Sequence, residues 1–320
     1  MDKEKSKIDF NFLSEARPIH ALNTVRVTQM NHIVEILSLS VEPSNLSNIK
    51  RIDKYIYQDL NTGEIKEYQT SDNRSQNIAS LKKTFKSIRN LINNNFTGAA
   101  NELFITLTYA DNMTDASRLY QDFQVFIQRL RYKYLDIDYI SVVEPQNRGA
   151  WHCHVLIRFN ALKRVYVSNN DVTARLWGHG FTVTKDLKQV DNVGAYLSSY
   201  MADIEVTDEN SEIILESIKY LPNGEQLKIE EKEIVEGGKK VKKRYAKGSR
   251  LHMYPPGMNI YRCSRGIKKP ETEKMKYFQT KKIVGVGPPN YSRTIDVSKD
   301  GMPLNSLTYE QYNLKRPKKQ

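Results

Sequence analysis

Two histidines and one glutamate have the residue types and the spacing of a metal site. His152 and His154 are separated by one residue within an apolar stretch that we expect to form a β-strand. Because side chains alternate between the two faces of a strand, both imidazoles project from one face and Cys153 projects from the other. Glu144 precedes His152 by eight residues, and a hairpin turn between them would bring its carboxylate beside the imidazoles. Such a set suits Mn²⁺ or Zn²⁺, and Mg²⁺ where further oxygen ligands and water complete the shell.

Two tyrosines supply candidate nucleophiles. Tyr196 and Tyr200 are four residues apart in a predicted helix, so they share a face. A tyrosine hydroxyl that attacks a DNA phosphodiester forms a covalent linkage, which stores the energy of the broken bond for rejoining. A free phenol has a pKa of about 10, so it needs a nearby cation or base, or a polarised phosphate, to react at neutral pH. In a chain with 19 tyrosines, the same pair is also typical of an ordinary amphipathic helix.

The elements that must position these residues follow the order strand, helix, strand, strand, helix, strand, and then one more helix. Hydrophobic periodicity predicts strands at 103–109, 139–144, 151–159 and 181–187, and helices at 119–134, 171–177 and 191–203. This order predicts an α+β fold with a ferredoxin-like (RRM-like) antiparallel sheet, helices on one face, and N- and C-terminal additions. In that arrangement the first and third strands are central neighbours.

The charge of the chain favours an anionic partner. The net charge is +12 and the pI is about 9.4, which is typical of proteins that bind nucleic acid. We expect DNA contacts where basic and aromatic residues are concentrated. The basic residues concerned are Lys239, Lys240, Lys242, Lys243, Arg244, Lys247, Arg250, Arg262 and Arg265. A solvated charged face, or packing of the segment 250–265 back on the sheet, is the alternative interpretation.

The composition also argues against several classes of protein. The two cysteines, Cys153 and Cys263, are too few for a disulfide framework or a four-cysteine zinc site. The sequence contains no phosphate-binding P-loop motif, so we expect no nucleotide cofactor. It contains no apolar run of about 20 residues and no apolar core near its first residue, so we expect a cytoplasmic protein without a membrane partner.

Three segments, taken in order, resemble the motifs of rolling-circle replication initiators in the HUH endonuclease superfamily, which occur in plasmids and phages. The run Phe-Ile-Thr-Leu-Thr-Tyr at 104–109 is similar to the first motif. Glu144 with the run at 151–156 resembles the second motif, histidine-hydrophobic-histidine, and 194–201 resembles the third, which carries the catalytic tyrosine. Ser199 is a departure, because members with two tyrosines often have lysine directly before the second one.

The resemblance implies a specific chemistry. Mg²⁺ or Mn²⁺ would be held by His152, His154 and Glu144, with Tyr196 as the first nucleophile and Tyr200 as the second. A 5′-phosphotyrosine intermediate would form, and the released 3′-OH would prime synthesis. The expected partners are single-stranded origin DNA and, since no motor motif is present, a host helicase in the bacterial cytoplasm.

Four regions follow from this interpretation. We expect an N-terminal accessory region of strands plus a basic helix at 1–100 and an HUH endonuclease core at 101–205. We expect a charged insert with a basic, aromatic DNA-binding segment at 206–270, and a C-terminal tail at 271–320.

Three other functions remain open. An HUH transposase or a mobilisation relaxase would use the same motifs, although relaxases generally place the tyrosine before the histidines. A catalytically inactive DNA-binding protein would keep the fold without nicking. A metal-dependent hydrolase that activates water would cut DNA without becoming attached to it.

Overall fold

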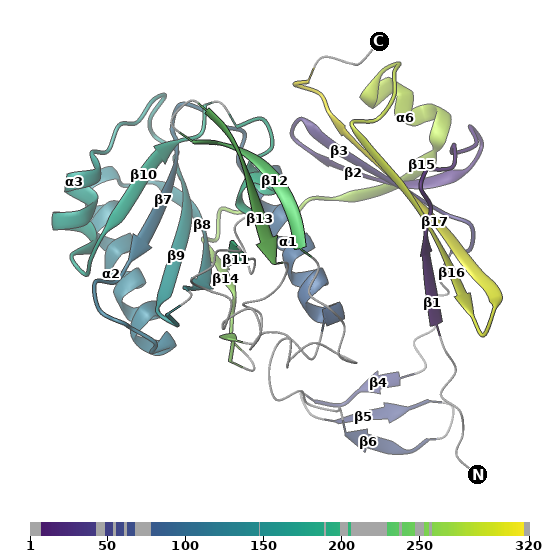
Figure 1. The fold of residues 1–320 in the computed structure, drawn as a ribbon, viewed down its shortest axis with the longest axis horizontal. Coiled ribbons are helices and arrows are strands. Elements are labelled where there is room, and N and C mark those ends of the chain that lie inside the picture. Colours follow the sequence, from purple (N-terminus) through teal and green to yellow (C-terminus); the bar gives the residue numbers. More distant parts are fainter. Residues whose placement is uncertain are drawn as a thin grey trace. The chain divides into compact units, whose positions relative to one another are not determined.

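The structure, a computed structural model, describes residues 8–42, 49–53, 56–60, 63–67, 78–146, 148–188, 190–198, 204–205, 229–236, 239–246, 253–255 and 258–316 (Figure 1). The chain divides into two compact units. Unit 1 contains Met1–Thr70 and Glu271–Gln320, and unit 2 contains Ser71–Pro270.

Unit 2 is built on a five-stranded antiparallel sheet with the order β10-β7-β9-β8-β14. The strands are β7 (Glu102–Thr108), β8 (Ile137–Pro145), β9 (Trp151–Phe159), β10 (Thr182–Asp186) and β14 (Tyr261–Cys263). The first and third strands, β7 and β9, are paired at the centre, with β8 beside β9 and β10 beside β7. The predicted α+β class and the ferredoxin-like strand order are therefore confirmed, and β14 is an additional edge strand next to β8.

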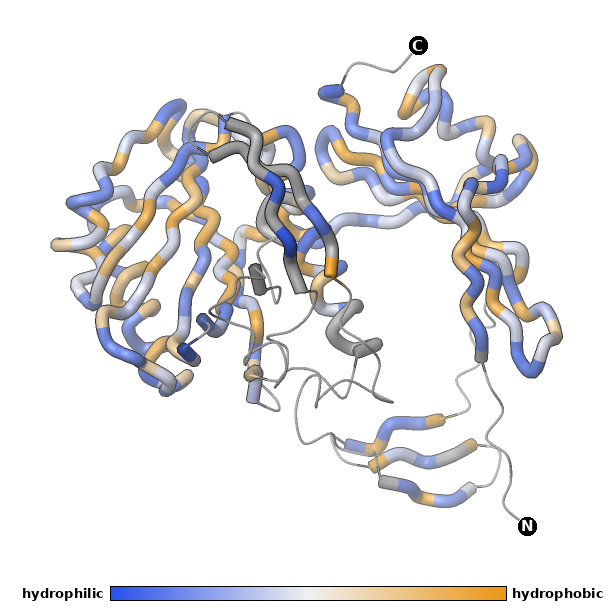
Figure 2. Tube along the Cα trace, in the orientation of Figure 1, coloured by the Kyte–Doolittle hydropathy of each residue, from blue (hydrophilic) through white to orange (hydrophobic). Residues whose placement is uncertain are grey.

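One face of this sheet is covered by α2 (Ala116–Tyr134) and by the π-helix η2 (Val172–Trp177), which follows the short α3 (Asn169–Asp171). The buried stripe of α2 has helical spacing and consists of Leu119, Phe123, Phe126, Ile127 and Leu130. Trp177 of η2 meets the Phe126 ring edge-on at 6.2 Å between centroids. Figure 2 shows the apolar stretches that run along the strands these helices cover.

The opposite face of the sheet is contacted by the end of α1 (Ile78–Asn95). Arg158, which shares that face with His152 and His154, donates a hydrogen bond to the carbonyl oxygen of Asn95 at 2.6 Å. The helix α4 (Val193–Ser198) packs in turn on α1, where the Gly194 N–H donates to Asn93 Oδ1 at 2.8 Å. The basic helix that we expected in an N-terminal accessory region thus belongs to the same unit as the core.

Unit 1 is formed by the two ends of the chain. Its six-stranded sheet has the order β1-β16-β17-β3-β2-β15. The elements are β1 (Ile8–Phe12), β2 (Thr24–Met30), β3 (Ile33–Leu39), β15 (Thr272–Lys276), α6 (Tyr277–Val284), β16 (Tyr291–Lys299) and β17 (Met302–Asn313). Val284 of α6 packs with Val25, Val34, Ile36 and Tyr312 of the sheet in a small core. A three-stranded sheet of β4 (Ile49–Arg51), β5 (Ile56–Asp59) and β6 (Ile65–Glu67) also lies in this unit.

The predicted C-terminal tail at 271–320 is wrong for residues 271–316. β17 pairs with β3 from Leu307–Leu39 to Asn313–Ile33, and its residues Thr308, Glu310 and Tyr312 are buried. The segment is polar because its buried positions include threonines and a glutamate that are hydrogen-bonded to one another or to tyrosines, as in the Thr294–Thr308 and Tyr277–Glu310 pairs. Polar composition therefore does not indicate an unfolded segment here.

Candidate metal and nucleophile site

The register of three strands brings the predicted metal ligands together. Glu144 of β8 lies opposite His152 of β9, and Val142 lies opposite His154. On the other side of β9, Thr108 and Thr106 of β7 lie opposite His152 and His154. Residues opposite one another in an antiparallel pair share a face. The glutamate, both histidines and both threonines therefore lie on one face of the central sheet.

His154 is held at both of its ring nitrogens. Its Nε2 lies 2.8 Å from Glu144 Oε2, and its Nδ1 lies 3.1 Å from Thr106 Oγ1. An ionised carboxylate only accepts hydrogen bonds, so a neutral His154 carries its proton on Nε2 and accepts from Thr106 at Nδ1. Phe104 stacks on the ring at 5.6 Å between centroids. With exposures of 4% for Glu144 and 7% for His154, this contact is shielded from water.

His152 lies one step further along the strand and is half-buried. Its Nε2 is 3.3 Å from Thr108 Oγ1, and its ring is perpendicular to that of His154, with 6.0 Å between centroids. The hydroxyls of Thr106 and Thr108 thus orient the two imidazoles in the same way. We did not assign a role to either threonine from the sequence, although their positions opposite the histidines follow from strand alternation.

The donor set suits a divalent cation in chemistry, although the side chains are not arranged around one. Two imidazoles and one carboxylate are common ligands of Mn²⁺ and Zn²⁺, and water can complete a shell for Mg²⁺. Among the described residues, no group of three or more His, Cys, Asp or Glu side chains is placed to hold a metal ion. A cation would have to replace the proton on His154 Nε2 that now bridges to Glu144.

The backbone of Tyr196 lies in α4, next to α1. Val193 of α4 is buried, and Gly194 sits so close to α1 that an added Cβ would be 2.6 Å from Asn93 Oδ1 and 2.7 Å from Arg89 O. Only glycine allows this approach, and it fixes the start of the helix that carries Tyr196. The Tyr196 side chain and all of Tyr200 lie outside the described residues, so their roles stay predictions.

These elements carry a family signature. Residues 102–205 match the family of replication-associated proteins described as ORF2/gene 2 protein. The match covers about a third of the chain and contains Glu144, His152, His154, Tyr196 and Tyr200. It confirms the resemblance to replication initiators and supports a role in initiating DNA replication. No curated protein matches the chain significantly.

Within the segment that matches this replication family, Cys153 is part of the core and not of the site. It lies between the two histidines but faces the α2 side of the sheet, where it is buried. Burial raises the pKa of its thiol far above the usual value, so the thiolate that binds metals is not formed there.

Beyond the segment that matches this replication family, most of the predicted DNA-binding residues lie on a charged hairpin. Lys239, Lys240, Lys242, Lys243 and Arg244 are in β13 (Lys239–Ala246), which pairs with β12 (Ile229–Glu236) and β11 (Ile204–Glu205). Glu231 lies opposite Arg244 and Glu233 opposite Lys242, so the acidic strand offsets part of the basic charge. The sequence analysis treats the acidic and basic stretches separately. Lys247 and Arg250 lie outside the described residues.

The segment that leads into β14 packs on the core. Tyr254 is fully buried, and its hydroxyl donates to the carbonyl oxygen of Val143 at 3.0 Å. Arg262 of β14 places its guanidinium 3.5 Å from the centroid of the Tyr120 ring on α2, and Arg265 is exposed just beyond the strand. No helix in the described parts of the chain is long and apolar enough to cross a membrane.

Proposed function

We propose that this protein initiates rolling-circle replication by nicking one origin strand with Tyr196 and later rejoining it. The observation that carries the proposal is the contact between Glu144 and His154 beside His152, on the open side of the central sheet of a segment that matches replication-associated proteins. The link from α4 through α1 to this same face supports Tyr196 as the nucleophile.

The proposed reaction is a transesterification. The Tyr196 hydroxyl oxygen attacks the scissile phosphorus and the bond from phosphorus to the 3′-oxygen breaks. The 3′-oxygen leaves with a proton as a free 3′-OH that primes synthesis, and the phosphate with its 5′ strand stays on the tyrosine. Attack by a 3′-OH reverses these steps and rejoins the strand. Tyr200 would serve a second transfer.

His152, His154 and Glu144 would hold the Mg²⁺ or Mn²⁺ ion. Bound there, the ion would polarise and orient the scissile phosphate. The side chains of the protein provide the orientation. Thr106 and Thr108 hold the imidazoles on the sheet face, and Phe104 excludes water from one side of His154. The proposal includes single-stranded origin DNA and a host helicase as partners, in a bacterial cytoplasm.

The test is covalent capture of DNA. The full chain is incubated with a library of single-stranded oligonucleotides and Mn²⁺, and the adduct is measured on a denaturing gel. We expect Tyr196→Phe to lose the adduct and keep DNA binding, because only the nucleophilic oxygen is removed. Tyr132→Phe, at a tyrosine that is 92% exposed on α2, is the matched control and should behave as wild type. A full yield of adduct from Tyr196→Phe would reject the assignment.

An inactive DNA-binding protein is the second candidate, and the Glu144–His154 pairing together with Ser199 favours it. It predicts no cleavage under any metal condition, so nicking that EDTA abolishes would exclude it. A hydrolase that activates water predicts nicks without attached protein, which the same gel distinguishes.

A further inference from the structure

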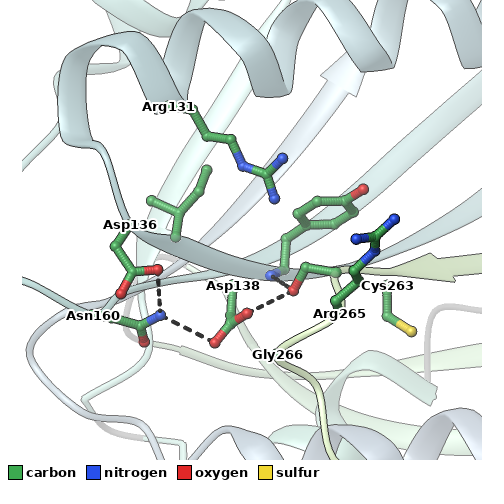
Figure 3. Close-up of a pocket in the computed structure, with 10 residues that line it drawn as sticks. Arg131, Asp136, Asp138, Asn160, Cys263, Arg265 and Gly266 are labelled. Carbon is green, nitrogen blue, oxygen red and sulfur yellow. Dashed lines mark hydrogen bonds between the residues drawn. The ribbon is translucent and has the colours of Figure 1, made fainter.

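A polar pocket opens at the end of the central sheet that is remote from the histidines. It has a volume of about 760 Å³ and lies between the end of α2, the start of β8 and the segment after β14. Figure 3 shows Arg131 and Arg265 entering it from two sides, while Asp136, Asp138 and Asn160 form the side on the left. All of these residues belong to unit 2.

Three hydrogen-bond donors in this pocket are uncommitted. Within the described part of the chain, the guanidinium groups of Arg131 and Arg265 make no ion pair or hydrogen bond, and neither does the Tyr139 hydroxyl. The Tyr139 ring is fixed edge-on against Phe123 at 5.4 Å between centroids. Burial raises the pKa of Tyr139 while the charge of Arg131 opposes the shift, so this hydroxyl stays protonated and lies within the field of Arg131. Two guanidiniums and one hydroxyl are donors without acceptors.

The acidic residues of the pocket do not cancel this charge. Asp138 accepts from Arg158 Nη2 at 2.8 Å, Ser264 Oγ at 2.8 Å and Asn160 Nδ2 at 3.1 Å, so its charge is already compensated. Asp136 is exposed and accepts from Asn160 Nδ2 at 3.2 Å. One carboxylate therefore faces two arginines, and the pocket is left with a net positive charge.

A second pocket of about 540 Å³ continues this surface along β14, since both pockets are lined by Tyr139 and Cys263. Arg262 lines the second pocket and stacks on Tyr120, whose hydroxyl donates to the carbonyl oxygen of Asn259 at 3.0 Å. The stacking holds a third guanidinium in place. Planar guanidinium groups bind phosphate oxygens with two hydrogen bonds each, which suits a strand of repeated phosphates.

We propose that the pocket between α2, β8 and β14 binds a phosphate group through Arg131, Arg265 and Tyr139, and that this phosphate belongs to a DNA backbone. The second part rests on the proposed function, which makes DNA the partner. The pocket lies six residues along β8 from Glu144, or about 20 Å at the rise of a β-strand. It would thus anchor the strand several nucleotides away from the nick.

The test measures DNA binding without cleavage. The full chain with Tyr196→Phe is titrated in EDTA with a labelled, mixed-sequence single-stranded oligonucleotide at several salt concentrations. We compare it with Arg131→Ala/Arg265→Ala and with a control that removes the same charge, Arg118→Ala/Arg175→Ala. The control arginines are exposed and pair with Asp122 and Asp171 at 3.6 Å, outside the pocket. Binding of inorganic phosphate to each protein is followed by ³¹P NMR.

Loss of two phosphate contacts should make the log–log salt dependence of affinity shallower by about 1.4, and each single variant by about 0.7. The control should keep the original slope, and phosphate should bind to the control but not to the pocket variant. Equal slopes in all proteins, or equal changes in both double variants, would overturn the proposal. Phosphate binding with unchanged DNA slopes would show a site for free phosphate and reject the DNA backbone. Because nicking is never measured, failure of the tyrosine chemistry cannot produce any of these results.

Discussion

The two ends of the β8–β9 strand pair hold similar contacts that serve different purposes. At one end Glu144 of β8 contacts His154 of β9, and at the other end Asp138 of β8 contacts Arg158 of β9, both at 2.8 Å. Asp138 accepts hydrogen bonds from three side chains, and guanidinium is neither deprotonated nor able to bind a metal. An imidazole can lose its proton and bind a cation instead. The Asp138 end is therefore structural, while the Glu144 end keeps groups that can change partner.

The largest expected effect is at the histidine end. We expect His152→Ala/His154→Ala to reduce metal-dependent nicking by at least about 100-fold, because both nitrogen ligands are lost. The measurement is the initial rate of oligonucleotide cleavage in Mn²⁺. His20→Ala, at an exposed histidine in unit 1, should retain the wild-type rate. Metal-dependent nicking by the double variant at the normal rate would remove the functional side of the comparison.

The next effect concerns stability at the other end. We expect Asp138→Ala to lower the free energy of unfolding by about 2 kcal/mol, because Arg158 and Ser264 lose their acceptor in a largely buried position. Urea denaturation measures the loss. Nicking per folded molecule should stay normal at low temperature. A variant with normal stability and no nicking would show that this end is also part of the site.

A smaller effect separates orientation from ligation. Thr106→Val removes the hydroxyl that holds His154 Nδ1 and should weaken Mn²⁺ binding about 10-fold, as loss of an outer-shell partner commonly does. Isothermal titration with Mn²⁺ measures the affinity. Thr184→Val on β10, which faces away from the histidines and bonds Asn169, is the control. Equal affinities in both variants would mean that Thr106 does not position the ligand.

The smallest effect is a pH dependence of stability. Burial acts to raise the pKa of Asp138, but the hydrogen bonds from Ser264, Asn160 and Arg158 outweigh it, so the pKa lies below the ordinary 3.8. With a lowered folded-state pKa, the stabilisation is fully present above pH 3.8 and is lost as the pH falls through the folded-state pKa. The difference in melting temperature between wild type and Asp138→Asn should therefore shrink below about pH 4. A difference that stays constant down to pH 2 would contradict this.

The sequence allowed the central sheet and the histidine face to be predicted because both depend on local patterns. Alternation along 151–159 placed His152 and His154 on one face, and the short turn after Pro145 placed Glu144 beside them. The cap of α2 was one residue off: Asp115, and not Thr114, accepts from the Ser117 and Arg118 N–H groups. Adjacent polar residues compete for such a cap, and sequence alone does not decide between them.

Pairings between distant segments could not be predicted in the same way. Arg158 and Asp138 were missed because their partners, Asn95, Ser264 and Asn160, come from three separate segments. The hairpin that sets Glu231 and Glu233 against the basic strand was missed for the same reason. The sheet of unit 1 was missed because β17 and β3 lie at opposite ends of the chain, and no periodicity records which strands become neighbours.

The sheet of unit 1 imposes an order of events during synthesis. Strands β2 and β3 leave the ribosome early, but β15 and β17, which flank them, follow only after the roughly 200 residues of Ser71–Pro270. At about 5–20 residues per second, this delay lasts roughly 10–40 s. The catalytic core can therefore fold while the edges of β2 and β3 are still unpaired. A chain released early would lack unit 1 altogether, so completion of this sheet marks a full-length product.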